Sequence, residues 1–276
     1  MKKSLTFLLL AIAMQTHATP PGARTTQKLE QILASEHRSA ENRLRDQYRH
    51  PAETLAFFGI ADTQTVVEIF PGGGWYTEIL APLLKAHGKL YEASFADHGN
   101  YSSSTPYQIR ATTNLKKKLH AQPALYEAVT VSTLQVPEAT EIAPAGSADL
   151  VLTFRNVHNW LKDGSADPVF SAFYRALKPG GILGLVEHRA QPGTSVEQTI
   201  KSGYVTEAEV IRLAEKAGFR LLAKSEINAN AKDSKDYPDG VWTLPPSLSG
   251  NPAEKQRYLA IGESDRMTLK FIKPRP

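Results

Sequence analysis

The chain has 276 residues, no cysteine, and 32 Lys and Arg against 28 Asp and Glu, which gives a formal net charge of +4. The absence of cysteine excludes a disulfide framework, a thiolate metal site and a lipoprotein attachment site. So small an excess of positive charge gives no support for a nucleic-acid-binding protein. The one basic cluster, Lys116-Lys117-Lys118, lies in a helical pattern, and we interpret it as a solvated face.

Residues 1–18 have the pattern of a signal peptide. Lys2 and Lys3 form a basic start, residues 5–14 are apolar, and Thr16-His17-Ala18 is a small-residue cleavage site. The apolar stretch is shorter than the roughly 20 residues that a membrane-spanning helix needs. We predict cleavage after Ala18, a periplasmic or secreted location, and no stable membrane insertion after cleavage; an uncleaved anchor is the alternative. Cleavage leaves a formal charge of +2, from 30 basic and 28 acidic residues.

Residues 19–64 are predicted to form an N-terminal helical extension. The charged segment Thr25 to Gln47 has apolar residues at helical spacing, and His50-Pro51 interrupts the pattern. A second short helix is expected from Ala52 to Phe58, ending at Gly59.

From residue 65 onward, strand and helix patterns alternate, which predicts an α/β fold with a doubly wound parallel sheet. The expected strands are Thr65–Phe70, Lys89–Ser94, Ala128–Ser132, Asp149–Phe154 and Gly181–Glu187. The expected helices are Tyr76–Lys85, Pro106–His120, Ala166–Leu177 and Thr206–Ala217.

The end of the chain has a different pattern. Phe219–Ile227 and Arg266–Lys273 are strand-like with no convincing helix between them, so we expect an antiparallel C-terminal hairpin. Residues 233–262 are rich in Pro, Gly, Ser and Asp but contain Tyr237 and Trp242. A long loop that carries aromatic residues indicates a packed lid rather than a linker.

A glycine-rich turn follows the first strand of the sheet, in Val67-Glu68-Ile69-Phe70-Pro71-Gly72-Gly73-Gly74-Trp75-Tyr76-Thr77. A turn between a buried strand and a helix is where open α/β sheets bind ligands, and glycine allows the backbone to approach one closely. Thr77 stands in place of the third glycine of the dinucleotide-binding fingerprint, which argues against a dinucleotide-dependent oxidoreductase. A turn needed only to reverse the chain is the alternative.

The pattern Glu68-x-x-x-Gly72-x-Gly74 resembles the first motif of class I S-adenosylmethionine (SAM)-dependent methyltransferases. Further segments resemble that family's second strand, its fourth strand and the turn before its fifth strand: Gly88–Ala93, Ala148–Leu152 and Leu177–Gly181. The amino-acid sequences of residues 67–76, 154–160 and 264–266 are similar to those of a bacterial group of exported, predicted class I methyltransferases. The resemblance implies a seven-stranded, mostly parallel sheet over residues 65–276, and SAM as the cofactor.

The resemblance also implies a cofactor site. Glu68, Gly72, Gly73 and Gly74 would contact SAM, and an acid at the end of the second strand would hold its ribose. Here that position is Ser94, with Glu92 two residues earlier on the same face. Three possibilities stay open: Glu92 substitutes if the strand ends early, Asp97 reaches the ribose if the loop after the strand folds back, or the Ser94 hydroxyl binds the ribose more weakly than a carboxylate.

Polar and aromatic residues follow the fourth and fifth strands at their carboxyl ends, where the ligand crevice of such a sheet lies. His158 is the candidate general base, Asn156 is a candidate to orient the methyl acceptor, and His188 is a second acid–base candidate. His158 capping a helix is the alternative. Although Glu187 lies beside His188, no spacing such as H-E-x-x-H supports a metal site, so we predict none.

Asp265-Arg266 opens the last strand, and we interpret it as an internal ion pair rather than an anion site. The predicted function is a SAM-dependent methyltransferase that acts on a small molecule or a cell-envelope component. The alternative is an exported ligand-binding protein on a methyltransferase scaffold without methyl transfer, because SAM is made in the cytoplasm and Ser94 replaces the usual acid.

Overall fold

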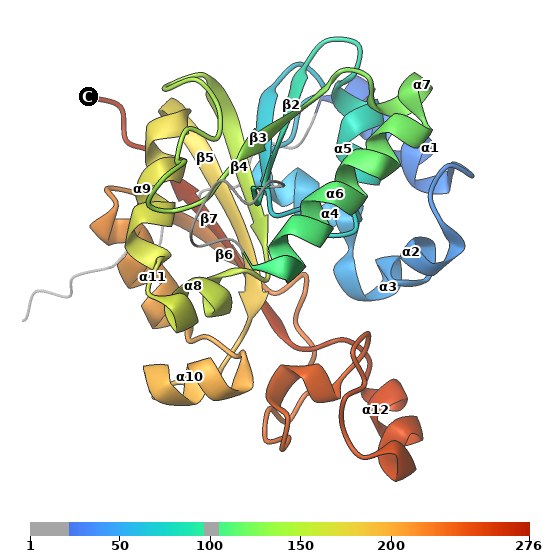
Figure 1. Ribbon diagram of the computed structural model, residues 1–276, viewed down its shortest axis with the longest axis vertical. Coiled ribbons are helices and arrows are strands. Elements are labelled where there is room, and N and C mark those ends of the chain that lie inside the picture. The colour runs from blue at the N-terminus through green and yellow to red at the C-terminus, as the bar shows by residue number, and fades with distance from the viewer. Residues whose placement is uncertain (1–21, 97–104) are drawn as a thin grey trace, which may run out of the picture.

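The computed structural model describes residues 22–96 and 105–276, which form a seven-stranded sheet covered by helices on both faces (Figure 1). The strand order is β3-β2-β1-β4-β5-β7-β6. The strands are β1 (Thr65–Ile69), β2 (Lys89–Ser94), β3 (Val129–Thr133), β4 (Ala148–Phe154), β5 (Leu177–His188), β6 (Arg220–Ser225) and β7 (Arg266–Ile272). Strands β1 to β5 pair in parallel, and β7 is antiparallel to both β5 and β6. The predicted α/β fold with an antiparallel C-terminal pair is confirmed.

The helices form two layers. Figure 1 shows α4, α5 and α6 on one side of the sheet, with α1 and α7 beyond them, and α8, α9 and α11 on the other side. The helices are α1 (Ala23–Ala34), α2 (Ala40–Leu44), α3 (Asp46–Arg49), α4 (Pro51–Phe58), α5 (Thr77–Leu84), α6 (Pro106–Ala121), α7 (Pro123–Tyr126), α8 (Val157–Asp163), α9 (Ala166–Ala176), α10 (Val196–Ser202), α11 (Glu207–Lys216) and α12 (Lys255–Ile261).

The alternation of side chains along β1 shows why both layers are needed. Val67 and Ile69 pack into the core formed with α8, α9 and α11, and Val66 packs into the core formed with α4, α5 and α6. All three side chains are at most 1% exposed. Glu68 points to the same face as Val66, because side chains alternate along a strand, so this acid is buried beneath the α5 layer.

The helix predicted from Thr25 to Gln47 is broken into α1, α2 and α3, so this prediction is wrong in its continuity. Ser39 begins a new helix because its hydroxyl accepts a hydrogen bond from the backbone N–H of Asn42. Just before it, the buried Arg38 side chain makes a bidentate ion pair with Asp46 at 2.6 and 2.8 Å. This ion pair links the start of α2 to α3 and folds the extension back on itself.

Residues 233–262 contain two 3-10 helices, Gly240–Thr243 and Pro252–Glu254, followed by α12. The prediction that no helix lies between the last two strands is therefore wrong, because the 3-10 helices and α12 are too short for their periodicity to be recognised in the sequence. No helix in the described part of the chain is long and apolar enough to span a membrane. The predicted signal peptide and Asp97 lie outside the described residues.

Candidate functional site

The turn after β1 contains three residues in left-handed backbone conformation: Phe70 (φ 47°), Gly72 (φ 58°) and Gly74 (φ 77°). Glycine adopts the left-handed conformation without strain, so Gly72 and Gly74 fit their positions in the turn. Gly73 has an ordinary φ, and a Cβ there would meet open space. A Cβ on Gly74 would lie 3.3 Å from Nζ of Lys118. Of the three glycines, only Gly72 lines the neighbouring cavity.

Lys118 connects α6 to this turn. Its ammonium group donates to the Gly73 carbonyl at 2.9 Å and pairs with Glu78 at 2.7 Å. For Lys118, the interpretation as part of a solvated face is therefore wrong, since its side chain is only 28% exposed. No local pattern indicates this contact, because Lys118 and Gly73 are 45 residues apart in the sequence.

A cavity of about 820 Å³ lies across the carboxyl ends of the first four strands. Phe70, Phe95 and Leu134, which follow β1, β2 and β3, line one part of it. The rings of Phe70 and Phe95 stack at a centroid distance of 3.9 Å. After β4, Asn156 and His158 line the other part, and the amide of Asn156 donates to the Ile69 carbonyl at 3.2 Å. Such a volume is typical of a small-molecule or cofactor site.

Glu68 and Glu92 form a buried carboxyl pair beside the turn. They are direct partners on the parallel strands β1 and β2. Thr77 donates its hydroxyl to Glu68 at 3.0 Å, whereas neither carboxylate oxygen of Glu92 has a hydrogen-bond partner. Burial raises the pKa of Glu68 to about 7, and burial together with the charge of Glu68 raises the pKa of Glu92 well above its usual range. Because the two carboxyls titrate together, at least one proton is held by the pair at neutral pH.

Neither member of this pair lines the cavity, and Ser94 does not line it either. The Ser94 hydroxyl lies 2.7 Å from that of Thr112, which donates onward to the Phe95 carbonyl at 2.8 Å. Ser94 is thus bonded to α6 inside the protein. The predicted contacts of Glu68, Ser94 and Glu92 with a cofactor stay predictions. Among the described residues, the cavity receives no carboxylate from β2.

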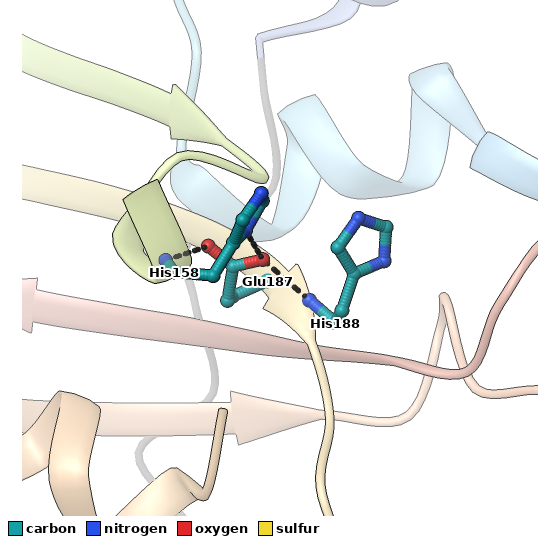
Figure 2. Close-up of side chains that lie close together, drawn as sticks. All are labelled: His158, Glu187 and His188. Carbon is teal, nitrogen blue, oxygen red and sulfur yellow. Dashed lines mark hydrogen bonds and ion pairs between the residues drawn. The ribbon is translucent and has the colours of Figure 1, made fainter. Parts of the chain in front are cut away.

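His158, Glu187 and His188 lie together where β4 and β5 end (Figure 2). One oxygen of Glu187 accepts from the backbone N–H of Val157 at 2.6 Å, and the other lies 3.1 Å from Nδ1 of His158. An ionised carboxylate only accepts hydrogen bonds, so Nδ1 of His158 carries the proton and Nε2 is left as an acceptor. His158 lies inside α8, whose N-cap is Asn156, so the alternative that His158 caps this helix is wrong. His158 lines the cavity, where it is placed to act as a base.

His188 is bonded differently. Its backbone N–H donates to Glu187 at 2.8 Å, and its Nδ1 lies 2.6 Å from the hydroxyl of Ser264. Burial, followed by the charges of His158 and Arg155, lowers the pKa of His188 well below its usual range. His188 is therefore neutral at pH 7, and its ring centroid lies 5.5 Å from that of His158. The ring of Trp242, from the 233–262 segment, packs edge-on against His158 at 6.0 Å.

The expected Asp265–Arg266 ion pair is wrong. Asp265 pairs with Arg189 at 2.9 Å and with Lys235 at 2.7 Å. Arg266 instead pairs with Glu263 at 3.1 Å. Because successive side chains of a strand point to opposite faces, neighbours in sequence at the start of β7 reach different partners.

The sequence also failed to indicate an arginine-rich centre beside the two histidines. It consists of Arg45, Arg49, Arg155, Arg266 and the carboxylate of Glu263. Arg45 and Arg49 come from the N-terminal extension, more than 200 residues away from Glu263. No local spacing could have revealed a contact of that sequence separation.

No family model and no curated protein matches the sequence. Solved structures do match the fold. A SAM-dependent methyltransferase from Aquifex aeolicus is 15% identical with a TM-score of 0.53, covering 90% of this chain and 98% of its own. A putative sarcosine dimethylglycine methyltransferase from Galdieria sulphuraria is 17% identical with a TM-score of 0.54, covering 89% of this chain and 91% of its own.

The fold is that of the SAM-dependent methyltransferases. The same comparison finds the cyclase SpnF, 16% identical over 91% of this chain and 93% of its own, with a TM-score of 0.50. Identities this low show the fold alone. Since proteins described by different activities share it, the function must be argued from the site.

Proposed function

We propose that the protein is a SAM-dependent methyltransferase that acts on a small molecule or a cell-envelope component. The observation that supports this most directly is the position of the 820 Å³ cavity, which lies at the carboxyl ends of β1 to β4 beside the glycine turn. This is where ligands bind to open α/β sheets. The fold shared with methyltransferases supports the same proposal.

The residues of the cavity fit an adenosine-containing cofactor. Phe70, Phe95 and Leu134 offer apolar surface for a base, and Gly72 allows close approach of the backbone. Gln135 and Asn156 add polar groups to the lining of the cavity. When bound, SAM would supply an electrophilic methyl group, and the protein then needs mainly to align an acceptor with it.

His158 is the candidate to remove a proton from the acceptor. It lines the cavity, and Glu187 fixes its Nδ1–H so that Nε2 is free to accept a proton. Asn156 is tied to the end of β1 by its amide, which makes it a candidate for orienting the acceptor. The neutral His188 at 5.5 Å leaves His158 as the stronger candidate for the base.

A ligand-binding protein without methyl transfer is the alternative, and one observation favours it. The β2 side chains that correspond to the usual ribose-binding acid both point away from the cavity, Ser94 towards Thr112 and Glu92 towards Glu68. An adenosine-containing cofactor would therefore lack a strong charge-assisted hydrogen bond from β2.

Calorimetric titration of residues 19–276 with SAM and with its demethylated product tests the two proposals. We expect both to bind, and we expect Val136→Trp, which fills a wall of the cavity, to weaken binding by at least about tenfold. Val196→Trp is the matched control, because Val196 is exposed on α10. No heat from either compound with the unmodified chain would reject the methyltransferase proposal and leave the alternative.

The proposed export has its own test. Mass spectrometry of the protein from its native host should show Thr19 as the first residue, since the predicted cleavage follows Ala18. Full-length protein in the cytosol would contradict the periplasmic location.

A further inference from the structure

The arginine-rich centre has more positively charged side chains than carboxylates to neutralise them. Among the residues that the structure describes, Glu263 is the one carboxylate paired with it, at 2.6 Å from Arg45 and 3.1 Å from both Arg49 and Arg266. With Arg155 included, the centre has four guanidinium groups and one carboxylate, which is a formal excess of three positive charges. Arg49 and Arg266 are only 3% and 2% exposed. Uncompensated charges this deeply buried cost free energy unless something pairs with them.

Arg155 is the member without a partner. Its guanidinium makes no hydrogen bond or ion pair with any residue that the structure describes, and its side chain remains partly open to solvent. Burial and the charge of Arg266 lower the pKa of Arg155 to about 10, so it is still a cation at neutral pH. The backbone of Arg155 is in the left-handed region (φ 61°) at the end of β4. A residue other than glycine is rarely found there, and such strain is common where a side chain serves a ligand.

The neighbouring His158–Glu187–His188 group is a candidate for a cation, but the surroundings oppose it. Its ligand atoms lie within 4.8 Å of one another. Both carboxylate oxygens of Glu187, however, already accept hydrogen bonds from the start of α8 and from His188. The positive charges of Arg155, Arg266 and Arg49 also act on His188, which disfavours a metal cation at the same place.

The arginine centre adjoins the cavity. Asn156, which follows Arg155 directly, lines the cavity, and so does His158, whose ring neighbours that of His188. The end of β4, the start of β7 and the N-terminal extension contribute the arginines, and Asn156 next to Arg155 brings the end of β4 to the wall of the cavity.

We propose that Arg155, with Arg49 and Arg266 behind it, binds a carboxylate or phosphate group of the acceptor. A guanidinium matches both groups by two parallel hydrogen bonds. The role of the bound molecule as methyl acceptor rests on the proposed methyltransferase function, but the anion site itself does not. The acceptor is then an anionic molecule, with its anionic group held by Arg155 and the remainder directed towards His158.

The test uses inorganic phosphate and acetate as probes on residues 19–276, with sodium chloride at matched ionic strength as the reference. Thermal melts and calorimetry on the unmodified chain should show that at least one probe binds; which one does distinguishes a phosphate from a carboxylate site. Arg155→Gln should weaken that binding by at least about tenfold. Arg43→Gln, which removes the same charge from an exposed position on α2, should leave it unchanged.

A stability measurement separates binding from a structural role. In chloride alone, Arg155→Gln should melt no lower than the unmodified chain, because the substitution removes an unpaired charge. A clearly lower melting temperature, or equal anion binding by Arg155→Gln and the unmodified chain, would overturn the proposal. So would a rise in melting temperature with Zn²⁺ when neither phosphate nor acetate produces one.

The anion site and the methyltransferase proposal can fail independently. Phosphate or acetate binding without SAM binding would reject the methyltransferase function and keep the anion site. If SAM binds and saturating SAM abolishes the anion response, Arg155 serves the cofactor's own carboxylate, and the assignment to the acceptor is wrong.

Discussion

Glu92 on β2 and Glu263 before β7 are both buried carboxyls of the same sheet, 0% and 4% exposed, yet their pKa values move in opposite directions. Burial and the neighbouring Glu68 raise the pKa of Glu92 well above its usual range. Burial also acts to raise the pKa of Glu263, but Arg49, Arg266, Arg45 and Arg155 outweigh it and hold that pKa at about 2. The comparison shows that depth alone does not decide the charge of a buried acid; the nearest charges decide it.

The largest effect should come from Glu263→Gln. Removing the one carboxylate leaves the buried arginines without a counter-ion, so we expect a loss of about 3 kcal/mol in the free energy of unfolding at pH 7. Urea denaturation measures this value. Because the pKa of Glu263 is depressed, its contribution is present above the unfolded pKa of 4.5 and is lost as the pH falls towards 2.

Glu197→Gln is the matched control, since the Glu197 side chain is exposed on α10 and pairs with Lys201 at the surface. It should change stability by less than about 0.5 kcal/mol. If Glu263→Gln loses no more stability than this control, the arginines have a partner other than Glu263, and the contrast between the two acids disappears.

Glu92→Gln should have the opposite sign. A neutral amide can be buried without taking up a proton, whereas folding of the unmodified chain at pH 8 has to protonate or bury a charged Glu92, so we expect a gain of about 2 kcal/mol in the free energy of unfolding at pH 8. The pKa values of both Glu68 and Glu92 are raised by folding, so the native state binds more protons than the unfolded state. Stability of the unmodified chain should therefore fall as the pH rises from 4.5 through about 7.

Denaturation of Glu92→Gln across this pH range should show a smaller slope than the unmodified chain. Glu41→Gln, at an exposed position of α2, should leave the slope as it is. A Glu92→Gln protein that is less stable than the unmodified chain at pH 8 would mean that Glu92 is charged and paired.

The smallest effect concerns Lys118, the cation whose charge lowers the pKa of both Glu68 and Glu92. Gly74→Ala would place a Cβ 3.3 Å from its Nζ at a backbone φ of 77°. We expect a loss of about 1 kcal/mol in thermal or urea unfolding. Displacement of Lys118 should also make the loss of stability with rising pH steeper.

Gly73→Ala is the matched control for Gly74→Ala, because a Cβ at Gly73 meets nothing within 4 Å and the φ is ordinary. The two substitutions should therefore differ. Equal effects would show that neither the left-handed backbone nor Lys118 makes a glycine necessary at position 74.

Much of the fold followed from local pattern. The predicted strand Lys89–Ser94 has the bounds of β2, and the other strands agree to within a few residues. Apolar runs bounded by turn residues are local signals, which a sequence shows directly. The short helices α8, α10 and α12 were not predicted, because seven residues give too little periodicity. Their formation depends on tertiary contacts, such as that of Glu187 with the start of α8.

The candidate site was predictable only in part. Placing His158, Asn156 and His188 at one edge of the sheet needed no more than the rule that carboxyl ends of parallel strands meet there. Three features depend on packing between segments that are distant in the sequence. They are the inward direction of Ser94, the contact of Lys118 with the glycine turn, and the grouping of arginines around Glu263. No spacing within the sequence encodes such contacts.

The place of β7 in the sheet has a consequence for how the protein is made. The last strand in the chain is an inner strand of the sheet, with β5 on one side and β6 on the other (Figure 1). Until β7 leaves the ribosome, β6 has no neighbour and the arginines of the N-terminal extension lack Glu263. Native assembly therefore waits until β7 has been synthesised, and under the proposed export this delay would keep the chain unfolded long enough to pass through a translocon.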